Sequence, residues 1–260
     1  MSIWRRVLER VRLRRLQRRL AGPRLLGAFA EVYPEAVFVE IGSNDGEQHD
    51  HLRPLILGRA WRGVMVEPVP YVFERLRRNY GSIDRIALEN AAIAEREGEL
   101  PFYYLRPPAD SERASLPSWY DGTGSLSRKT LLGHADKIPA LEQRLIEARV
   151  PSLTLESLCR KHRIERLDLL AIDTEGYDAR ILDSIDLAAR HPRMIVYEHF
   201  HLDPDERRRC RERIEGYGYE AIEEGFDTWC LDAVPEDALT ALWRRVEPAV
   251  SGAYVEREPA

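Results

Sequence analysis

Acidic and small residues follow two apolar runs of the chain, at positions that a parallel sheet would bring together. Glu40 lies in the run 37–41, and Glu67 ends the run 64–67, 27 positions later. The turn after the first run reads Gly42, Ser43, Asn44, Asp45 and Gly46. An acid at the end of the second strand can accept hydrogen bonds from both hydroxyls of a ribose. A simple tight turn would explain the glycines alone, but the two features together predict a nucleoside site.

The glycine turn lacks the GxGxxG spacing that places a pyrophosphate on a helix N-terminus. This favours a nucleoside without phosphates and disfavours a nicotinamide-dependent oxidoreductase. S-adenosylmethionine fits the description, because its ammonium suits a nearby carboxylate such as Glu40 or Asp45. The sequence therefore predicts S-adenosylmethionine as the cofactor.

If S-adenosylmethionine donates its methyl group to a hydroxyl, that hydroxyl must lose a proton, and a general base would be expected near the carboxyl edge of the sheet. Candidates are Asp173 and Glu175 after a fourth strand, and His199 and His201 after a fifth. Alternate positions share one face of an extended segment, so both histidines are expected to face the cleft. The competing interpretations are exposed loop histidines and, for the two acids, the start of a helix.

Metal binding is a weaker interpretation of the remaining polar residues. His49 and His51, with Asp45 and Asp50, match no familiar ligand spacing, and a polar helix start explains them. No metal ion is therefore predicted. A magnesium ion on the acidic residues near the fourth and fifth strands stays open as an alternative. Those residues are Asp173, Glu175, Asp178 and Glu198.

These residues need a scaffold, and the chain from residue 37 alternates short β-rich runs with helical segments. The pattern predicts an α/β fold of three layers, a Rossmann-like arrangement with a mostly parallel sheet. Strands are expected at 37–41, 64–67, 86–88, 167–172 and 194–198. Helices are expected from Pro70 to Gly81, from Thr154, and from Asp203, which forms a capping box with Glu206. Runs at 219–222 and 228–231 predict an antiparallel hairpin that closes the sheet.

Residues 101–150 interrupt the alternation with several prolines and one helical piece near 140–148. Long insertions of this kind are often lids, so this segment is expected to close over the cleft. From its position alone it would supply acceptor contacts through Trp119, Tyr120, Ser125 and His134.

The composition of the 260 residues, 44% hydrophobic and 32% charged, is that of a soluble globular protein and excludes disordered and collagen-like classes. Three dispersed cysteines, none in a CxxC, indicate neither a disulfide framework nor a zinc ribbon and fit a cytoplasmic location. No run of about 18 uncharged apolar residues exists, which excludes a transmembrane helix.

Charge is distributed unevenly along the chain. Residues 1–24 hold nine arginines and one glutamate, a charge of +8. The whole chain carries −5, so residues 25–260 carry −13. The first segment predicts a basic amphipathic helix that ends at Gly22-Pro23, followed by one catalytic domain.

The basic helix is expected to bind an anionic membrane surface, which would place the protein on the inner face of the membrane. Docking onto the acidic body or onto a second protomer is the alternative, so an oligomer stays open. Nucleic acid is not expected as a partner, because no stacking or groove-reading motif accompanies the arginines.

The sequence resembles the FkbM family of S-adenosylmethionine-dependent methyltransferases over about residues 36–200. The resemblance rests on the Glu40 to Gly46 turn, Glu67-Pro68, Asn90 to Ile93, Gly124 to Leu126, Ser152 to Leu155, Leu169 to Asp178 and Ile195 to Glu198. The stretch Ile172-Asp173-Thr174-Glu175-Gly176 is its most specific part. The acidic and histidine-rich segment 45–51 departs from the usual pattern.

The resemblance implies a class I methyltransferase fold and O-methylation, often of a sugar or polyketide hydroxyl. It implies contacts of Gly42, Ser43 and Asn44 with the methionine end, of Glu67 and Pro68 with the ribose, and of Asn90, Ala91 and Ala92 with the adenine edge. Asp173 would lie beside the methyl donor. We expect an O-methyltransferase for a saccharide or glycolipid precursor. The alternative is a catalytically silent nucleoside-binding scaffold that its basic helix recruits to a membrane or polyanion.

Overall fold

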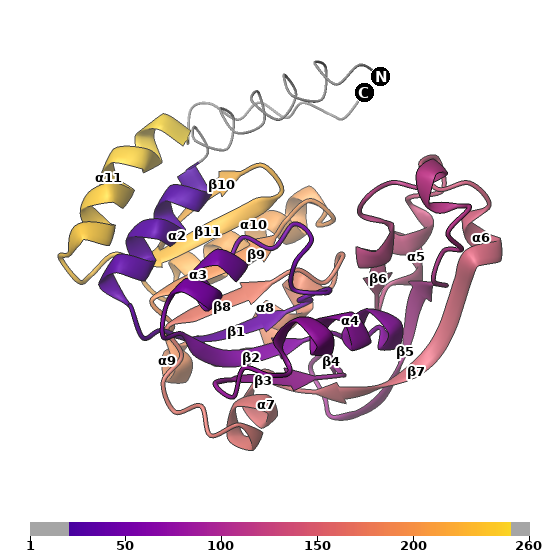
Figure 1. Cartoon of the computed structure of the whole chain (residues 1–260). Helices are drawn as coiled ribbons and strands as arrows, with labels where there is room; N and C mark the ends of the chain where they lie inside the picture. Colours follow the sequence, from indigo (N-terminus) through magenta and orange to yellow (C-terminus); the bar gives the residue numbers. More distant parts are fainter. Residues whose placement is uncertain (1–20, 251–260) are drawn as a thin grey trace, which may run out of the picture.

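A seven-stranded sheet forms the centre of the structure, a computed structural model that describes residues 21–250 (Figure 1). Its strand order is β3-β2-β1-β8-β9-β11-β10. The strands are β1 (Val37–Ile41), β2 (Arg62–Val66), β3 (Ile86–Glu89), β8 (Leu169–Ile172), β9 (Met194–Glu198), β10 (Tyr219–Glu224) and β11 (Asp227–Asp232). The first five run parallel, and β11 pairs antiparallel with both β9 and β10. This topology confirms the expected class I methyltransferase fold with its closing hairpin.

Strands β1 and β8 are neighbours in the sheet although about 130 residues separate them in the sequence. From β1 the strand order continues to one edge of the sheet, and from β8 it continues to the other edge, so the order reverses between these two strands. In open α/β sheets, ligands bind outside the carboxyl ends of the strands at such a switch point. The carboxyl ends of β1 and β8 point toward the part of the chain that carries β5 to β7 (Figure 1).

Helices cover both faces of the sheet because its central strands are apolar on both faces. Val37, Val39 and Ile41 of β1 face one helical layer, and Phe38 faces the other. The first layer contains α7 (Leu155–Lys161), α8 (Asp178–Ser184), α9 (Leu187–Arg190) and α10 (Pro204–Glu215). The second contains α2 (Ala21–Val32), α3 (Arg53–Gly58), α4 (Pro70–Tyr80) and α11 (Ala238–Val250). The sequence predicts α4, α7 and the capping box of α10 at these positions.

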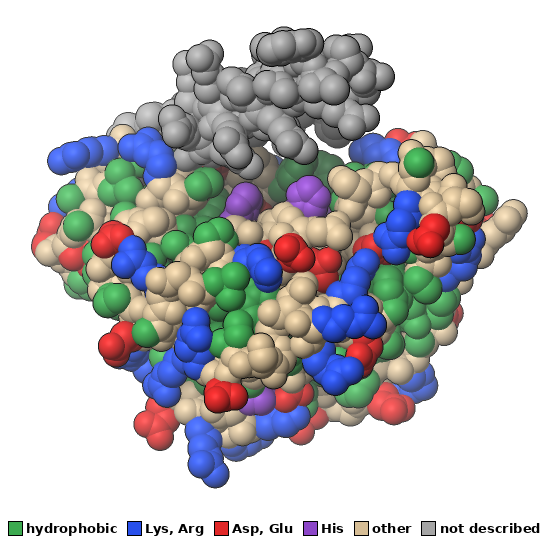
Figure 2. Space-filling model, in the orientation of Figure 1, with side chains coloured by type: hydrophobic (Ala, Val, Ile, Leu, Met, Phe, Trp, Pro, Cys, Tyr) green, Lys and Arg blue, Asp and Glu red, His purple; other side chains and the backbone are tan. Residues whose placement is uncertain are grey.

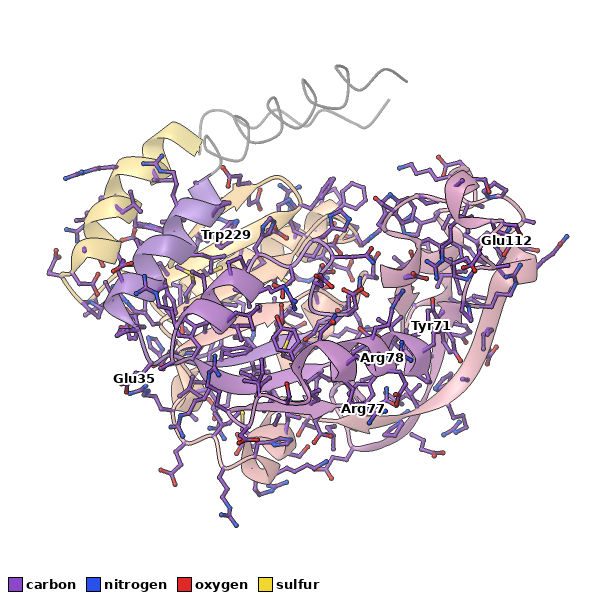
Figure 3. The ribbon with its side chains drawn as sticks, in the orientation of Figure 1. Glu35, Tyr71, Arg77, Arg78, Glu112 and Trp229 are labelled. Atoms are coloured by element: carbon purple, nitrogen blue, oxygen red, sulfur yellow. The ribbon has the colours of Figure 1, made fainter. Side chains whose placement is uncertain are left out.

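Helix α2 packs beside α11 and is anchored at its first residues (Figure 1). The backbone N–H groups of Ala21 and Gly22 donate to the two carboxylate oxygens of Glu224, at 2.7 and 2.8 Å. Gly22 lies against Trp229, which Figure 3 labels beneath α2, and an added Cβ would come within 2.2 Å of the indole ring. The helix end predicted at Gly22-Pro23 is wrong: both residues belong to α2, because proline is tolerated in a first helical turn.

The boundary expected at residue 24 therefore lies within α2. The arginine-rich stretch that precedes Ala21, and with it the expected membrane contact, lies outside the described residues. Residues 251–260 lie outside them as well. In the described part of the chain, no helix is long and apolar enough to span a membrane.

The insertion, residues 92–153, forms a second sheet in the order β4-β7-β5-β6. Its strands are β4 (Ala92–Ile93), β5 (Gly98–Leu105), β6 (Gly124–Ser125) and β7 (Leu145–Leu153), with short helices η1 (Arg113–Ser115), η2 (Tyr120–Gly122), α5 (Arg128–Leu132) and α6 (Leu141–Arg144). The expectation of a helix near 140–148 is wrong beyond Arg144. From Ile146 the chain alternates inward and exposed side chains and pairs with β5 along its length, and this pairing outweighs its helix-favouring composition.

Helix α4 holds the insertion against the sheet. Tyr71, labelled in Figure 3, donates its hydroxyl to the buried Asp121 at 3.1 Å. Arg75 donates to the same carboxylate at 2.7 Å. These contacts fix one side of the insertion beside the carboxyl ends of the strands. Closure of the insertion as a lid stays a prediction.

We expect Glu224→Ala to lower the free energy of unfolding by about 1–3 kcal/mol, because it leaves two buried N–H groups of α2 without an acceptor. Urea unfolding measures this difference. Glu220→Ala, in the same strand at an exposed position, is the matched control and is expected to change stability by less than about 0.5 kcal/mol. Equal midpoints for the two variants would show that Glu224 does not anchor α2.

Candidate active site

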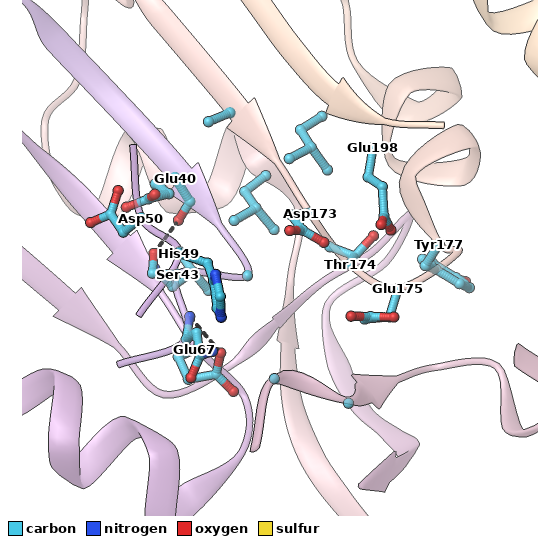
Figure 4. A pocket seen from close by; sticks show the side chains of 18 of the residues that line it. Glu40, Ser43, His49, Asp50, Glu67, Asp173, Thr174, Glu175, Tyr177 and Glu198 are labelled. Atoms are coloured by element: carbon cyan, nitrogen blue, oxygen red, sulfur yellow. Dashed lines mark hydrogen bonds between the residues drawn. The ribbon is translucent and has the colours of Figure 1, made fainter. Parts of the chain in front are cut away.

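A cavity of about 700 Å³ opens at the carboxyl ends of β1, β2, β8 and β9 and extends to the insertion. This volume suits a nucleoside-sized ligand with room for part of a second molecule. Figure 4 shows carboxylates on both sides of the cavity, with Glu40, Asp50 and Glu67 on one side and Asp173, Glu175 and Glu198 on the other.

The glycine turn after β1 brings the backbone of two strands into contact. Gly42 has φ +83°, and an added Cβ would lie 1.6 Å from the carbonyl oxygen of Asp173. The N–H groups of Gly42 and Ser43 both donate to the carbonyl of Val66 at the end of β2, at 2.9 and 3.0 Å. Only glycine fits this position, because any side chain would push the β1 turn away from β8.

Glu67 connects the ends of β1 and β2. Its Oε2 accepts from the N–H of Asn44 at 3.0 Å, and its Oε1 accepts from the N–H of Val69 at 2.7 Å. Burial raises the pKa of Glu67 to about 7, although both hydrogen bonds act in the opposite direction. A carboxylate oxygen can accept more than one hydrogen bond, so Glu67 retains acceptor capacity toward the cavity.

Glu40 carries a buried carboxylate whose Oε2 has no hydrogen-bond partner among the described residues. Burial raises its pKa well above the ordinary range, and the nearby Asp50 adds to this effect. A buried oxygen without a hydrogen bond lowers the stability of the folded state unless a donor reaches it, and a charged donor is the most favourable one. The position is suited to an ammonium group.

A second set of acids lies across the cavity. Asp227 on β11 is the cross-strand partner of Glu198 on β9, so two like charges face each other. Burial raises the pKa of Asp227 to about 7, and it raises the pKa values of Glu198 and Asp173 well above their ordinary range. Neighbouring carboxylates raise all three further. An accumulation of acids with raised pKa values along one wall of the cavity favours a cationic ligand.

Most residues predicted to bind the cofactor line this cavity. They are Glu40, Gly42, Ser43, Asn44, Glu67, Pro68, Ala91, Ala92 and Asp173. Asp45 and Asn90 do not line it. Asp45 accepts from the N–H groups of Glu47 and Gln48 and so shapes the turn, while the Asn90 amide donates to the carbonyls of Glu67 and Pro68. Both support the cofactor-lining segments from behind.

The four predicted catalytic residues separate into two groups. Asp173, Glu175 and His201 line the cavity, whereas His199 does not. The expectation that both histidines face the cleft is wrong, because β9 ends at Glu198 and the chain then turns. His199 is buried with Nδ1 2.9 Å from the Thr228 hydroxyl, and burial lowers its pKa to about 4.

His201 lies 2.9 Å from Glu175 (Nε2 to Oε2), and His134 of the insertion approaches the same oxygen at 3.7 Å. Burial alone would raise the pKa of Glu175, but these two histidines hold it below its usual range. Of the residues expected to contact an acceptor, Trp119 and His134 line the cavity. Tyr120 and Ser125 instead donate their hydroxyls to the carbonyls of Arg106 and Glu175.

The sequence analysis missed the contribution of the hairpin. Phe226, Asp227 and Trp229 line the cavity although they follow the last parallel strand by about 30 residues. An acid directly after the Gly225-Phe226 turn was a usable signal, but its partner Glu198 becomes evident only from the strand register.

Asp50 also lines the cavity while accepting from the N–H groups of Leu52 and Arg53, so the expected polar helix start is confirmed and is at the same time part of the site.

Comparisons with known proteins point to one family. A family model described as the methyltransferase FkbM domain matches residues 40–229. The 2-O-methyltransferase NoeI of Sinorhizobium fredii is 27% identical over 150 residues, which is 57% of this chain and 57% of NoeI. The crystal structure of methyltransferase FkbM from Methylobacillus flagellatus aligns with a TM-score of 0.49 at 11% identity, covering 76% of this chain and 44% of that one. A methyltransferase from Geobacter sulfurreducens aligns with a TM-score of 0.39 at 13% identity, covering 80% and 76%.

The raised pKa of Glu67 makes stability depend on pH. The folded state holds a proton up to about pH 7, whereas the unfolded state releases it near 4.5, so this group's contribution to stability is lost as pH rises between these values. The loss amounts to at most about 3 kcal/mol. We expect the free energy of unfolding of Glu67→Gln, measured by urea titration, to fall less steeply over this range than that of the unsubstituted chain. Parallel curves would contradict the assignment.

Proposed function

The chain belongs to the FkbM methyltransferase family, and on this basis we propose that it transfers a methyl group from S-adenosylmethionine to a hydroxyl of a saccharide or glycolipid precursor. The observation that carries the proposal is a nucleoside-sized cavity lined by carboxylates with raised pKa values, of which Glu40 and Asp173 form no ion pair among the described residues. A ligand with a ribose, an ammonium and a sulfonium matches these groups.

The residues present fit the proposed cofactor. Glu67 retains acceptor capacity for the ribose hydroxyls, and the unpartnered Oε2 of Glu40 can accept from the ammonium. Ala91, Ala92 and Ile93 provide an apolar wall for the adenine. Once bound, the cofactor supplies an electrophilic methyl group, and its positive charge lies among acids that would otherwise hold protons.

Asp173 is the residue we assign as proton acceptor. It lies at the carboxyl end of β8, beside the Gly42 turn, and lines the cavity. Burial and neighbouring acids raise its pKa, which brings a carboxylate closer to the range in which a general base works at neutral pH. The remaining requirement is that the methyl donor and the acceptor hydroxyl are aligned, and the fixed strand ends provide this alignment.

The acceptor is proposed to enter from the insertion. Trp119 and Phe200 provide apolar walls there, and polar groups of the insertion and of the strand ends lie between them. Such a mixture suits a sugar, which presents both apolar faces and hydroxyls. NoeI is named as a 2-O-methyltransferase, which supports an oxygen acceptor.

We expect S-adenosylmethionine to bind the chain in calorimetric titrations. Glu67→Ala is expected to weaken this binding at least about tenfold, because the substitution removes one hydrogen bond to a charged group. Glu74→Ala is the matched control, because Glu74 is an exposed acid paired only with Arg77 on the outer side of α4. No binding, or the same affinity in both variants, would refute the cofactor site.

The role of Asp173 requires a separate measurement. At a saturating concentration of cofactor, we expect Asp173→Asn to reduce methyl transfer about 100-fold or more. Transfer from a radiolabelled methyl donor to glycans of a cell extract gives the readout. Unchanged transfer in the variant would remove Asp173 as the base, whereas cofactor binding without transfer to any glycan would favour the scaffold alternative.

A further inference from the structure

Three potential metal ligands converge on the wall of the cavity from separate segments. His134 belongs to the insertion, Glu175 to the loop between β8 and α8, and His201 to the turn after β9. One ligand atom of each lies within 4.8 Å of those of the other two. Histidine and acidic side chains lie close together in the upper middle of the face shown in Figure 2.

The spacing of these atoms matches that of a metal site. Ligands bound at about 2.0–2.2 Å around a tetrahedral ion lie roughly 3.3 Å from one another. The Glu175 oxygen Oε2 lies 2.9 Å from His201 Nε2 and 3.7 Å from His134 Nε2, so the two distances bracket that value. Small side-chain rotations would equalise them.

A simple hydrogen bond does not account for the whole cluster. It would satisfy His201 and Glu175, but His134 Nε2 lies 3.7 Å from Glu175 Oε2, beyond hydrogen-bond distance, and is buried without a hydrogen-bond partner among the described residues. Glu198 adds a second such atom, because its Oε2 is also buried without a hydrogen bond and lies 3.9 Å from His201 Nε2. Buried polar atoms are nearly always satisfied, so their clustering at one point indicates a missing positive ligand.

The surroundings hold the three side chains in place. The hydroxyl of Ser125 donates to the backbone carbonyl of Glu175 at 2.7 Å. The Trp119 ring packs on His134 with centroids 5.1 Å apart, and the two imidazole rings meet edge to face at 5.3 Å. Ligands preorganised in this way retain their geometry without being drawn together by an ion.

We propose that His134, Glu175 and His201 bind a divalent first-row transition metal ion, with Zn²⁺ as the best match to two imidazoles and one carboxylate. Three protein ligands leave at least one coordination position, and all three residues line the cavity. Water or the acceptor hydroxyl can occupy it, and a bound hydroxyl loses its proton more readily. Glu175 and His201 then serve as ligands, and Asp173 takes the proton.

The site also ties the insertion to the sheet edge, because only His134 comes from the insertion. Metal binding is therefore expected to stabilise the insertion against the body. The metal site does not depend on the identity of the methyl donor or acceptor, so it can hold even if the proposed function fails.

The test uses the full chain, produced without a polyhistidine tag and freed of metal by chelation and dialysis. Titration with Zn²⁺ in a calorimeter is expected to give one equivalent per chain, and His134→Ala and His201→Ala are each expected to weaken binding at least about tenfold. Co²⁺ is the second probe, because its visible absorption reports nitrogen and oxygen ligands directly.

His162→Ala is the matched control. Its Nε2 lies 2.6 Å from Glu89 Oε1, a histidine–carboxylate pair without a second histidine, and its loss is expected to leave Zn²⁺ affinity unchanged. Circular dichroism and thermal unfolding show whether each variant folds, and Zn²⁺ is expected to raise the midpoint of the unsubstituted chain but not that of His134→Ala. The proposal would be overturned if Zn²⁺ showed no saturable binding. It would also be overturned if His134→Ala and His162→Ala weakened the binding equally.

Discussion

Desolvation, together with the mutual repulsion of the carboxylates at the ends of β1, β2, β8, β9 and β11, is the constraint on which the site depends. Glu40 and Glu198 are half-buried and Asp173 is exposed toward the cavity, yet desolvation, and after it neighbouring acids, raise the pKa values of all three. Without a cation, these groups retain protons that free carboxylates would release. Binding of a cation lowers these raised pKa values. The free energy that the folded state loses by holding the acids close together therefore contributes to binding.

The fold can hold such a cluster because the rest of the sheet is strongly apolar. Two helical layers bury β1 and β8 from both sides, and the contact between Gly42 and the Asp173 carbonyl fixes their ends together. Rigid strand ends prevent the acids from relaxing away from one another. The insertion contributes from the opposite side, held by the Tyr71 and Arg75 bonds to Asp121, and it places His134 near Glu175.

The parts of the fold that local patterns determine could be predicted from the sequence. The apolar runs predicted the parallel strands, the Asp203 capping box predicted α10, and Glu67, expected after the second strand, lines the cavity. Features set by pairing between distant segments could not be predicted in this way. The pairing of β7 with β5, the opposition of Asp227 and Glu198, and the turn that removes His199 from the cavity all depend on register. Asp45 does not line the cavity, and its hydrogen bonds to the turn cannot be distinguished in the sequence from a ligand contact.

Calorimetry of S-adenosylmethionine binding near pH 7, in two buffers of different ionisation enthalpy, tests the central claim most directly. If the cation relieves the repulsion, binding lowers the raised pKa values and releases protons, so the observed enthalpy will differ between buffers and the affinity will increase from about pH 6 to 8. S-adenosylhomocysteine, which lacks the sulfonium charge, will release fewer protons. Equal enthalpies in both buffers, with an affinity that does not change with pH, would contradict the account.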